Sequence, residues 1–237
     1  MKRNEQPEVQ IADLHYKIHA DKNKLSKALN LSLKQVSADI TLLTDQQVKY
    51  YSEARQIIRT TYEQYPDHEI ICFRLNSSND ITIPHCHYPE KTKPFEQILF
   101  LNFYEISFKK SLVKKNIHFD EDFGAGTNFP FGESLTFIQM AINKGVKVHF
   151  SSKYIGQHPE KYLFTPADEI NKLRSLGAID YKMHGWDYVI NYINHSVKKM
   201  EYREAKYGNG LIELNKMNAY LLGAKEFKDQ HLAQINL

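Results

Sequence analysis

The residues with the clearest chemical potential lie between positions 117 and 150. Three acidic residues and three glycines precede Glu133 there: Asp120, Glu121, Asp122, Gly124, Gly126 and Gly132. Such a run indicates an ordered surface loop. Apolar residues then recur at helical spacing, at Leu135, Ile138 and Ile142, so Glu133 is expected at a helix N-terminus. A carboxylate held there beside a loop can accept a proton from a bound hydroxyl group.

The segments around this loop alternate between helical and strand patterns. Apolar residues from Leu25 to Val36 follow helical spacing, and residues 39–43 then read as a short strand. Residues 146–150 alternate like a strand, and residues 151–159 read as the loop after it. From Pro166 onward we expect helices, over 167–176, 186–197 and 211–225. Alternating helices and strands predict an α/β domain.

Three short motifs of the acceptor-side segment together resemble family 2 glycosyltransferases. They are Phe119-Asp120-Glu121, Phe123-Gly124-Ala125-Gly126 and Gly132-Glu133. In that family a Gly-Glu-Asp element opens a helix and carries the catalytic base that deprotonates the acceptor hydroxyl. The resemblance therefore implies Glu133 as the base, with Ser134 at the aspartate position. It implies an acceptor loop that contains Asp120, Gly124 and Gly126.

The resemblance extends to the first helix and the strand after it. Lys24-Leu25-Ser26-Lys27-Ala28-Leu29-Asn30, followed by a strand and Thr44-Asp45, is similar to the family's Gly-Leu-Ser-x-x-Arg-Asn helix and Asp-x-Asp turn. It implies that the residues that bind the donor nucleotide are Ser26, Asn30, Asp45 and Gln47. The departures are chemical, because Leu29 replaces the arginine and Gln46 and Gln47 replace the second and third acids.

A divalent metal is the cofactor that this resemblance implies. Mg²⁺ and Mn²⁺ prefer carboxylate oxygens, and the two glutamines lower both the charge and the affinity of the site. The implied ligands are Asp45 and, from the loop after the last strand, His158. A turn-forming role for Asp45 at the strand end is the structural alternative.

The resemblance specifies a three-layer GT-A nucleotide-sugar-transferase fold, truncated at its N-terminal edge and followed by a helical C-terminal appendage. We divide the chain into residues 1–164, a partial GT-A-like domain, and residues 165–237, the helical extension. Only about one strand, from Val9, precedes the first helix, whereas the family begins with strand, helix and strand. An uncovered strand edge is an aggregation template, so we expect a homo-oligomer or a second polypeptide to complete the sheet.

Composition narrows the classes of partner and of compartment. The 237 residues carry 31 basic and 28 acidic residues, a net charge of +3, which gives no case for nucleic acid. Two cysteines, no signal-peptide pattern and no apolar run of membrane-spanning length indicate a cytoplasmic protein. Peripheral association with the inner face of the membrane is the alternative, because basic residues follow the apolar stripe of helix 186–197.

Two further groups have functional alternatives that the sequence disfavours. His85, Cys86 and His87 carry possible zinc ligands, but adjacent residues seldom converge on one ion. The lysines at 109, 110, 114 and 115 suit a solvated face better than a contact with a diphosphate or an anionic surface.

Two functions from different classes remain. The first is an inverting glycosyltransferase of surface-polysaccharide assembly, which moves a sugar from a nucleotide-diphosphate donor to a saccharide or lipid-linked acceptor. The second is a catalytically inactive relative, kept as a partner subunit or as a remnant of a truncated gene, because the departures all fall on donor chemistry. A stand-alone carbohydrate-binding module is a distant third.

Overall fold

The structure is a computed structural model, and it describes residues 9–12, 24–44, 46–77, 101–158, 166–207 and 210–235. The chain divides into two compact units. The first, here called the sheet unit, comprises Met1–Asp120 and Glu133–Tyr162. The second, the helical unit, comprises Glu121–Gly132 and Leu163–Leu237. The segment with Gly124 and Gly126 therefore groups with the C-terminal helices, although Glu133 belongs to the sheet unit.

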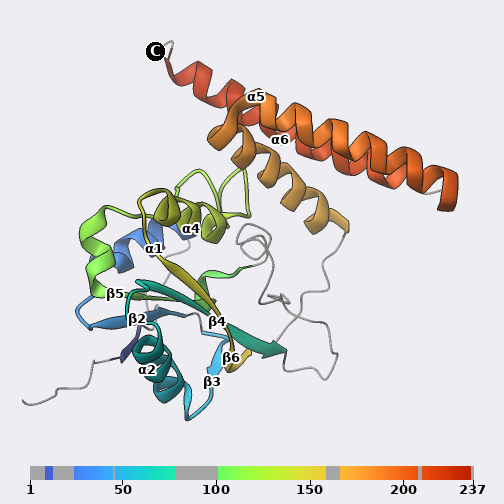
Figure 1. Ribbon diagram of the computed structural model, residues 1–237. Coiled ribbons are helices and arrows are strands. Elements are labelled where there is room, and N and C mark those ends of the chain that lie inside the picture. Colours follow the sequence, from blue (N-terminus) through green and yellow to red (C-terminus); the bar gives the residue numbers. More distant parts are fainter. Residues whose placement is uncertain are drawn as a thin grey trace, which may run out of the picture. The chain divides into compact units, whose positions relative to one another are not determined.

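The described part of the sheet unit is a mixed α/β structure (Figure 1). Its strands are β1 (Val9–Ala12), β2 (Ile40–Leu43), β3 (Lys49–Tyr50), β4 (Ile70–Ser77), β5 (Ile106–Lys109) and β6 (Val148–His158). Its α-helices are α1 (Leu25–Leu33), α2 (Ala54–Gln64) and α4 (Glu133–Asn143), with short 3-10 helices η1 (Phe103–Glu105) and η2 (Lys110–Lys115). The α/β class expected from the sequence is confirmed.

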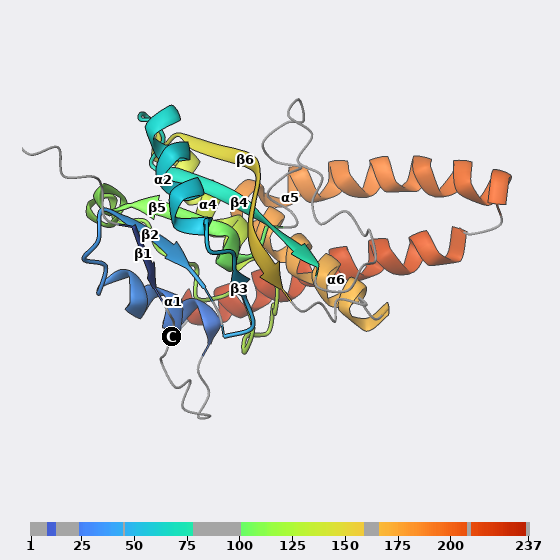
Figure 2. The ribbon, with the colours of Figure 1, turned by 90° about the horizontal axis from the view of Figure 1, so that it is seen from below.

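The six strands form one sheet in the order β1-β2-β5-β4-β6-β3. The pairs β1/β2 and β4/β6 are parallel, whereas β2/β5, β4/β5 and β3/β6 are antiparallel. Figure 2 shows β4 and β6 running side by side through the sheet. Strand β5 thus lies between β2 and β4, and β6 lies between β4 and β3, although β5 and β6 come later in the chain than the strands they separate.

Strand β2 has a partner on each side. Residues Val9–Ala12 of β1 pair with Ile40–Leu43 in parallel, and β5 pairs with the other edge of β2. The expectation that a homo-oligomer or a second polypeptide completes the sheet stays a prediction, but the described part of the chain itself covers this edge of β2. The N-terminal segment supplies the partner strand.

The helices of the sheet unit pack through apolar stripes. Ala54, Ile58 and Tyr62 of α2 are buried, and the Tyr62 hydroxyl lies 3.0 Å from Oγ of Ser107 on β5. Side chains alternate between the faces of a strand, so Ile106 and Phe108 face away from α2. Figure 1 shows α2 on one side of the sheet and α1 and α4 on the other. Tyr62, Ile106 and Phe108 are each less than 5% exposed, which places the core along both faces.

Strand β6 is longer than the sequence pattern indicates. It runs through His158, so the expected loop over 151–159 is wrong for every residue up to 158. The reason is tertiary pairing, because β4 pairs with β6 as far as Ser77 opposite His158, and β3 pairs with Gln157. Strand propensity depends on such neighbours more than on local sequence.

The helical unit contains two long helices, α5 (Pro166–Tyr207) and α6 (Gly210–Ile235). Gly185 (φ 73°, ψ −170°) interrupts α5, so a helix begins near Trp186 as expected, but the expected end of the preceding helix at residue 176 is wrong because residues 177–184 are also helical. Two glycines let the helices approach closely. A Cβ at Gly177 would lie 1.8 Å from the carbonyl oxygen of Tyr220, and one at Gly223 would lie 1.8 Å from that of Arg174.

None of the helices in the described ranges combines the length and the apolar character that crossing a membrane requires.

Candidate functional site

Glu133 is the first residue of α4, as the sequence predicts. Its side chain is partly buried, and the exposed amide groups at the helix start favour a carboxylate there. Gly132 before it has φ +102°, and a Cβ at that position would lie 2.3 Å from Cδ1 of Ile179. The positive φ favours glycine at this position, whereas the end of the Ile179 side chain could move to relieve the contact. The Gly-Glu pair thus fixes where the acid enters the helix.

Asn30 joins the first helix to the segment that leads into the acceptor loop. Its Nδ2 donates to the carbonyl oxygen of Phe119 at 2.9 Å, and its Oδ1 accepts from the Phe119 N–H at 2.7 Å. The Phe119 ring in turn stacks on Phe137 of α4, with centroids 4.2 Å apart and planes 10° apart. Asn30, predicted to bind the donor, therefore has a structural role that links α1, residue 119 and α4.

Several other residues of the predicted site are part of the core. Ser26 and Leu29 on α1 are 0% exposed, and Ser134 on α4 is 2% exposed. Oγ of Ser134 has no hydrogen-bond partner among the described residues. A hydroxyl or an aliphatic group buried to this degree has no direct access to a ligand in solution.

The glycine loop, Glu121–Gly132, has a backbone that only glycine adopts readily at two positions. Gly124 has φ 103° and Gly126 has φ 84°, both in the left-handed region. The Gly124 N–H donates to the carbonyl oxygen of Phe129 at 2.9 Å and closes the loop. Asp120, the residue just before it, is partly buried in the sheet unit.

Asp45, the predicted donor-side acid and metal ligand, lies outside the described residues. Thr44 before it is 1% exposed, whereas Gln46 and Gln47 after it are exposed. The turn after β2 therefore passes from the core to solvent within three residues.

Aromatic residues bring His158 close to the carboxyl end of β2. The Tyr50 hydroxyl lies 3.3 Å from the carbonyl oxygen of Leu43, where it can donate, and 3.5 Å from that of Tyr104. The Tyr104 ring stacks on the His158 ring, with centroids 4.8 Å apart and planes 5° apart. His158 is 7% exposed. The structure thus connects the residue predicted as a second metal ligand with the strand that leads to Asp45.

Glu105 is a buried acid close to His158, and the resemblance to the family did not indicate it. One Glu105 oxygen accepts from the Asn102 backbone N–H at 2.9 Å and from Asn102 Nδ2 at 3.3 Å. Burial raises the pKa of Glu105 to about 7, although hydrogen bonds from Asn102 and Leu75 and the proximity of His158 act in the opposite direction. The signal in the sequence was the spacing Asn102-x-x-Glu105, which is typical of a capping box.

The described residues do not by themselves suit a divalent cation. No group of three or more His, Cys, Asp and Glu side chains converges in the described ranges. At the carboxyl end of β2 the available donors are the His158 imidazole and the Glu105 carboxylate, which already accepts from Asn102. Mg²⁺ and Mn²⁺ require several oxygen ligands. No chemical step is therefore assigned to a metal.

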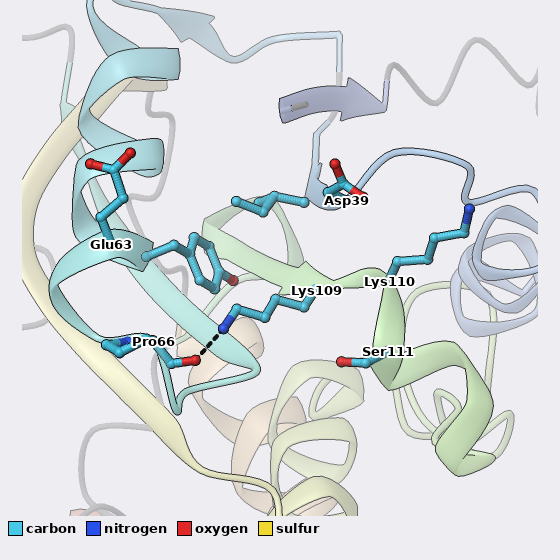
Figure 3. Close-up of a pocket in the computed structure, with 8 residues that line it drawn as sticks. Asp39, Glu63, Pro66, Lys109, Lys110 and Ser111 are labelled. Carbon is cyan, nitrogen blue, oxygen red and sulfur yellow. Dashed lines mark hydrogen bonds between the residues drawn. The ribbon is translucent and has the colours of Figure 1, made fainter. Parts of the chain in front are cut away.

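A cavity of about 360 Å³ lies at the opposite, amino end of β2 (Figure 3). Its lining residues are Asp39, Ile40, Tyr62, Glu63, Pro66, Lys109, Lys110 and Ser111. Lys109 Nζ donates to the carbonyl oxygen of Pro66, and Lys110 Nζ donates to that of Ser37 at 2.8 Å. These two lysines thus tie segments of the chain together, and the cavity lies away from the end of β2 that leads to Asp45.

His85, Cys86 and His87, the zinc alternative, lie outside the described residues.

No protein-family model matches the chain, and no curated protein matches it by sequence. Several solved structures are similar to it at low identity. S. aureus TarS residues 1–349 in complex with UDP is 12% identical over 85% of this chain and 61% of that chain, with a TM-score of 0.49. The mannosyltransferase PcManGT from Pyrobaculum calidifontis, in complex with GDP-Man and Mn²⁺, is 14% identical over 88% and 53%, with a TM-score of 0.42.

A longer TarS structure is 15% identical over 67% of this chain and 27% of that chain, with a TM-score of 0.44. The chain thus spans less than two thirds of the length of each of these proteins. Because all these TM-scores are below 0.5, the likeness alone assigns neither a family nor an activity.

Proposed function

We propose that this chain is a glycosyltransferase-like protein of the GT-A type, with an acceptor side that resembles the family and a donor side that departs from it. The reaction class is transfer of a sugar from a nucleotide diphosphate to a saccharide or lipid-linked hydroxyl, in surface-polysaccharide assembly. We further propose that the chain works in the cytoplasm, with peripheral membrane contact as the alternative. Residues 1–164 and 165–237 are the proposed domains.

One observation carries this proposal. The first-helix motif is far in the sequence from the two acceptor-side motifs at 119–121 and 132–133, and they meet through specific contacts. Asn30 pairs with Phe119, Phe119 stacks on Phe137, and α4 begins at Glu133. A chance resemblance of short motifs gives no reason for such convergence.

In the proposed reaction Glu133 is the catalytic base. Its carboxylate accepts the proton of the acceptor hydroxyl as that oxygen forms a bond to the anomeric carbon of the donor sugar. The bond from that carbon to the diphosphate breaks, and its electron pair leaves with the nucleoside diphosphate. Direct displacement of this kind inverts the anomeric configuration. General-base catalysis contributes typically 10²–10⁴-fold to the rate.

A second candidate function is an inactive homologue that acts as a partner subunit. The burial of Leu29 favours it, because this residue takes the position of the family's arginine and is 0% exposed. A buried leucine cannot donate to a phosphate. The acceptor side and the donor side would then have diverged separately.

The test is release of nucleoside diphosphate from a panel of UDP- and GDP-sugars, with saccharide acceptors, by the wild-type chain and Glu133→Gln. We expect the variant to lose about 10²–10⁴-fold of any acceptor-dependent release. Glu53→Gln is the matched control, because Glu53 is an exposed acid at the start of another helix, α2. It should retain the wild-type rate.

Two results would each contradict a part of this proposal. Equal rates in Glu133→Gln and the wild type would remove Glu133 as the base. No acceptor-dependent release with any donor, by a chain with wild-type circular dichroism, would favour the partner-subunit function.

A further inference from the structure

The carboxylate of Asp122, in the glycine loop, contacts both long helices of the helical unit. Its Oδ2 accepts from Lys182 Nζ of α5 at 2.8 Å and lies 3.3 Å from His231 Nε2 of α6. The side chains of Asp122, Lys182 and His231 are 36%, 34% and 36% exposed, so solvent screens these contacts only in part. A single loop side chain therefore connects α5 and α6.

An aromatic layer supports this contact. The Phe123 and Phe227 rings stack with centroids 5.7 Å apart and planes 8° apart. Lys182 Nζ lies 5.6 Å from the centroid of Phe123 and 5.3 Å from that of Phe227. An ammonium group over aromatic faces gains a favourable cation–π interaction. Lys182 thus contacts the loop in two ways, through the ion pair with Asp122 and through the cation–π interaction with Phe123.

The other end of the loop is held by a second cation. Arg174 of α5 donates from Nη1 to the carbonyl oxygen of Asn128 at 3.0 Å, and its guanidinium lies 5.4 Å from the centroid of the Phe129 ring. Arg174 Nε also donates to Glu226 of α6. Both ends of the loop therefore depend on residues of the two long helices.

The contact between His231 and Asp122 requires a charged imidazole. His231 Nδ1 lies 2.9 Å from the carbonyl oxygen of Phe227, which can only accept, so Nδ1 carries a proton. Nε2 can then donate to Asp122 only when it is protonated as well. Burial raises the pKa of Asp122, but Lys182 and His231 lower it by more, so the carboxylate is ionised.

We propose that Lys182 and His231 are positioning residues for the glycine loop, through the contacts of both side chains with Asp122 and of Lys182 with Phe123. That this loop receives an acceptor rests on the proposed function, but the hold itself does not. The two long helices would then position the loop that directly precedes the proposed base in the sequence.

The test is hydrogen–deuterium exchange of peptides covering 121–132 in the full chain, with each variant compared with the wild type at the same pH. Lys182→Met keeps the apolar stem and removes the charge, and we expect exchange about three- to tenfold faster than in the wild type. Lys182→Arg should restore protection. Lys225→Met, at an exposed site on α6, is the control and should match the wild type.

Rescue by Lys182→Arg separates the proposed role of the charge from simple packing. His231→Gln should also exchange faster than the wild type, because the neutral amide cannot form the charged contact with Asp122. Wild-type exchange in either Lys182→Met or His231→Gln overturns the proposal. If circular dichroism shows that a helix variant has lost structure, Asp122→Asn, which alters only the loop, decides by the same measurement.

Exchange requires no substrate, so its outcome is independent of the proposed function. Faster exchange in Lys182→Met, together with no sugar transfer by the wild type, would leave the hold on the loop intact and remove the glycosyltransferase function. Sugar transfer by the wild type, together with unchanged exchange in Lys182→Met, would support the glycosyltransferase function and overturn the hold on the loop.

Discussion

The side-chain amide of Asn30 forms two hydrogen bonds with the backbone of Phe119, across 89 positions of sequence. It satisfies both the N–H and the carbonyl group of a residue whose side chain is fully buried. A backbone without such partners would have to find them in water or remain unpaired. This contact is therefore a direct target for mutation.

We expect Asn30→Ala to destabilise the chain by about 1–3 kcal/mol, because it leaves two partly buried backbone groups without partners. Chemical denaturation of the two proteins measures the difference. Lys27→Ala, at an exposed position on the same helix, should stay within about 0.5 kcal/mol of the wild type. An Asn30→Ala chain as stable as Lys27→Ala would show that the contact contributes nothing.

Gly223→Ala should destabilise the helical unit. Alanine in a helix interior is ordinarily favoured over glycine by roughly 0.5–1 kcal/mol. Here the added Cβ would lie 1.8 Å from the carbonyl oxygen of Arg174, so the helices must move apart. We expect a net loss of about 1–3 kcal/mol. Thermal unfolding decides, with Asn218→Ala at an exposed α6 position as the control, and a higher melting temperature for Gly223→Ala would contradict the close packing.

Because the pKa of Glu105 is raised, we expect the free energy of unfolding to fall as the pH rises. Its pKa in the folded chain is raised by burial to about 7 from an ordinary value of 4.5. The stabilisation is therefore complete below about pH 4.5 and is lost as the pH passes through 7. The loss is on the order of 3 kcal/mol between about pH 4 and pH 8.

Glu105→Gln keeps an acceptor for Asn102 and cannot ionise, so this part of the pH dependence should disappear. Urea denaturation of both proteins at pH 5 and pH 8 measures it. Glu63→Gln, an exposed acid on α2, should retain the wild-type difference between the two pH values. The same difference in Glu105→Gln would exclude Glu105 as its source.

The isolated chain should bind nucleotide-diphosphate sugars weakly. Leu29 is fully buried where the family has an arginine, and loss of a charged hydrogen bond costs about 1.5–3 kcal/mol, or roughly ten- to a hundredfold in affinity. Calorimetric titration with UDP-sugars, with and without Mn²⁺, measures this affinity. Low-micromolar, metal-dependent binding would prove the prediction wrong.

Local patterns were sufficient to predict the elements that bear on chemistry. The helix that begins at Glu133 and the break near Trp186 follow from apolar spacing and from glycine, which are properties of neighbouring residues. The position of the turn after β2 also follows from the strand pattern before it, since β2 ends at Leu43. Each of these features depends on interactions within a few residues.

Features that depend on distant partners were missed. The extension of β6 to His158 results from pairing with β4, and no residue in 151–158 signals it alone. The role of Asn30 in binding the donor stays a prediction, but the motif could not indicate its hydrogen bonds with Phe119, because that partner is far along the chain. The burial of Leu29 and Ser134 could not be predicted from the motifs, because a motif specifies residue types and not their surroundings.

The strand order has a consequence for how the chain is made. Strand β5 lies between β2 and β4, and β6 lies between β4 and β3, so each of these two strands is synthesised after both of its neighbours. Until Lys109 has left the ribosome, β2 and β4 lack their common partner, and β3 has no partner before Gln157. Unpaired strand edges can associate with other chains, and distant pairing is slow. The growing polypeptide therefore keeps edges of its sheet unpaired until β6 has been synthesised.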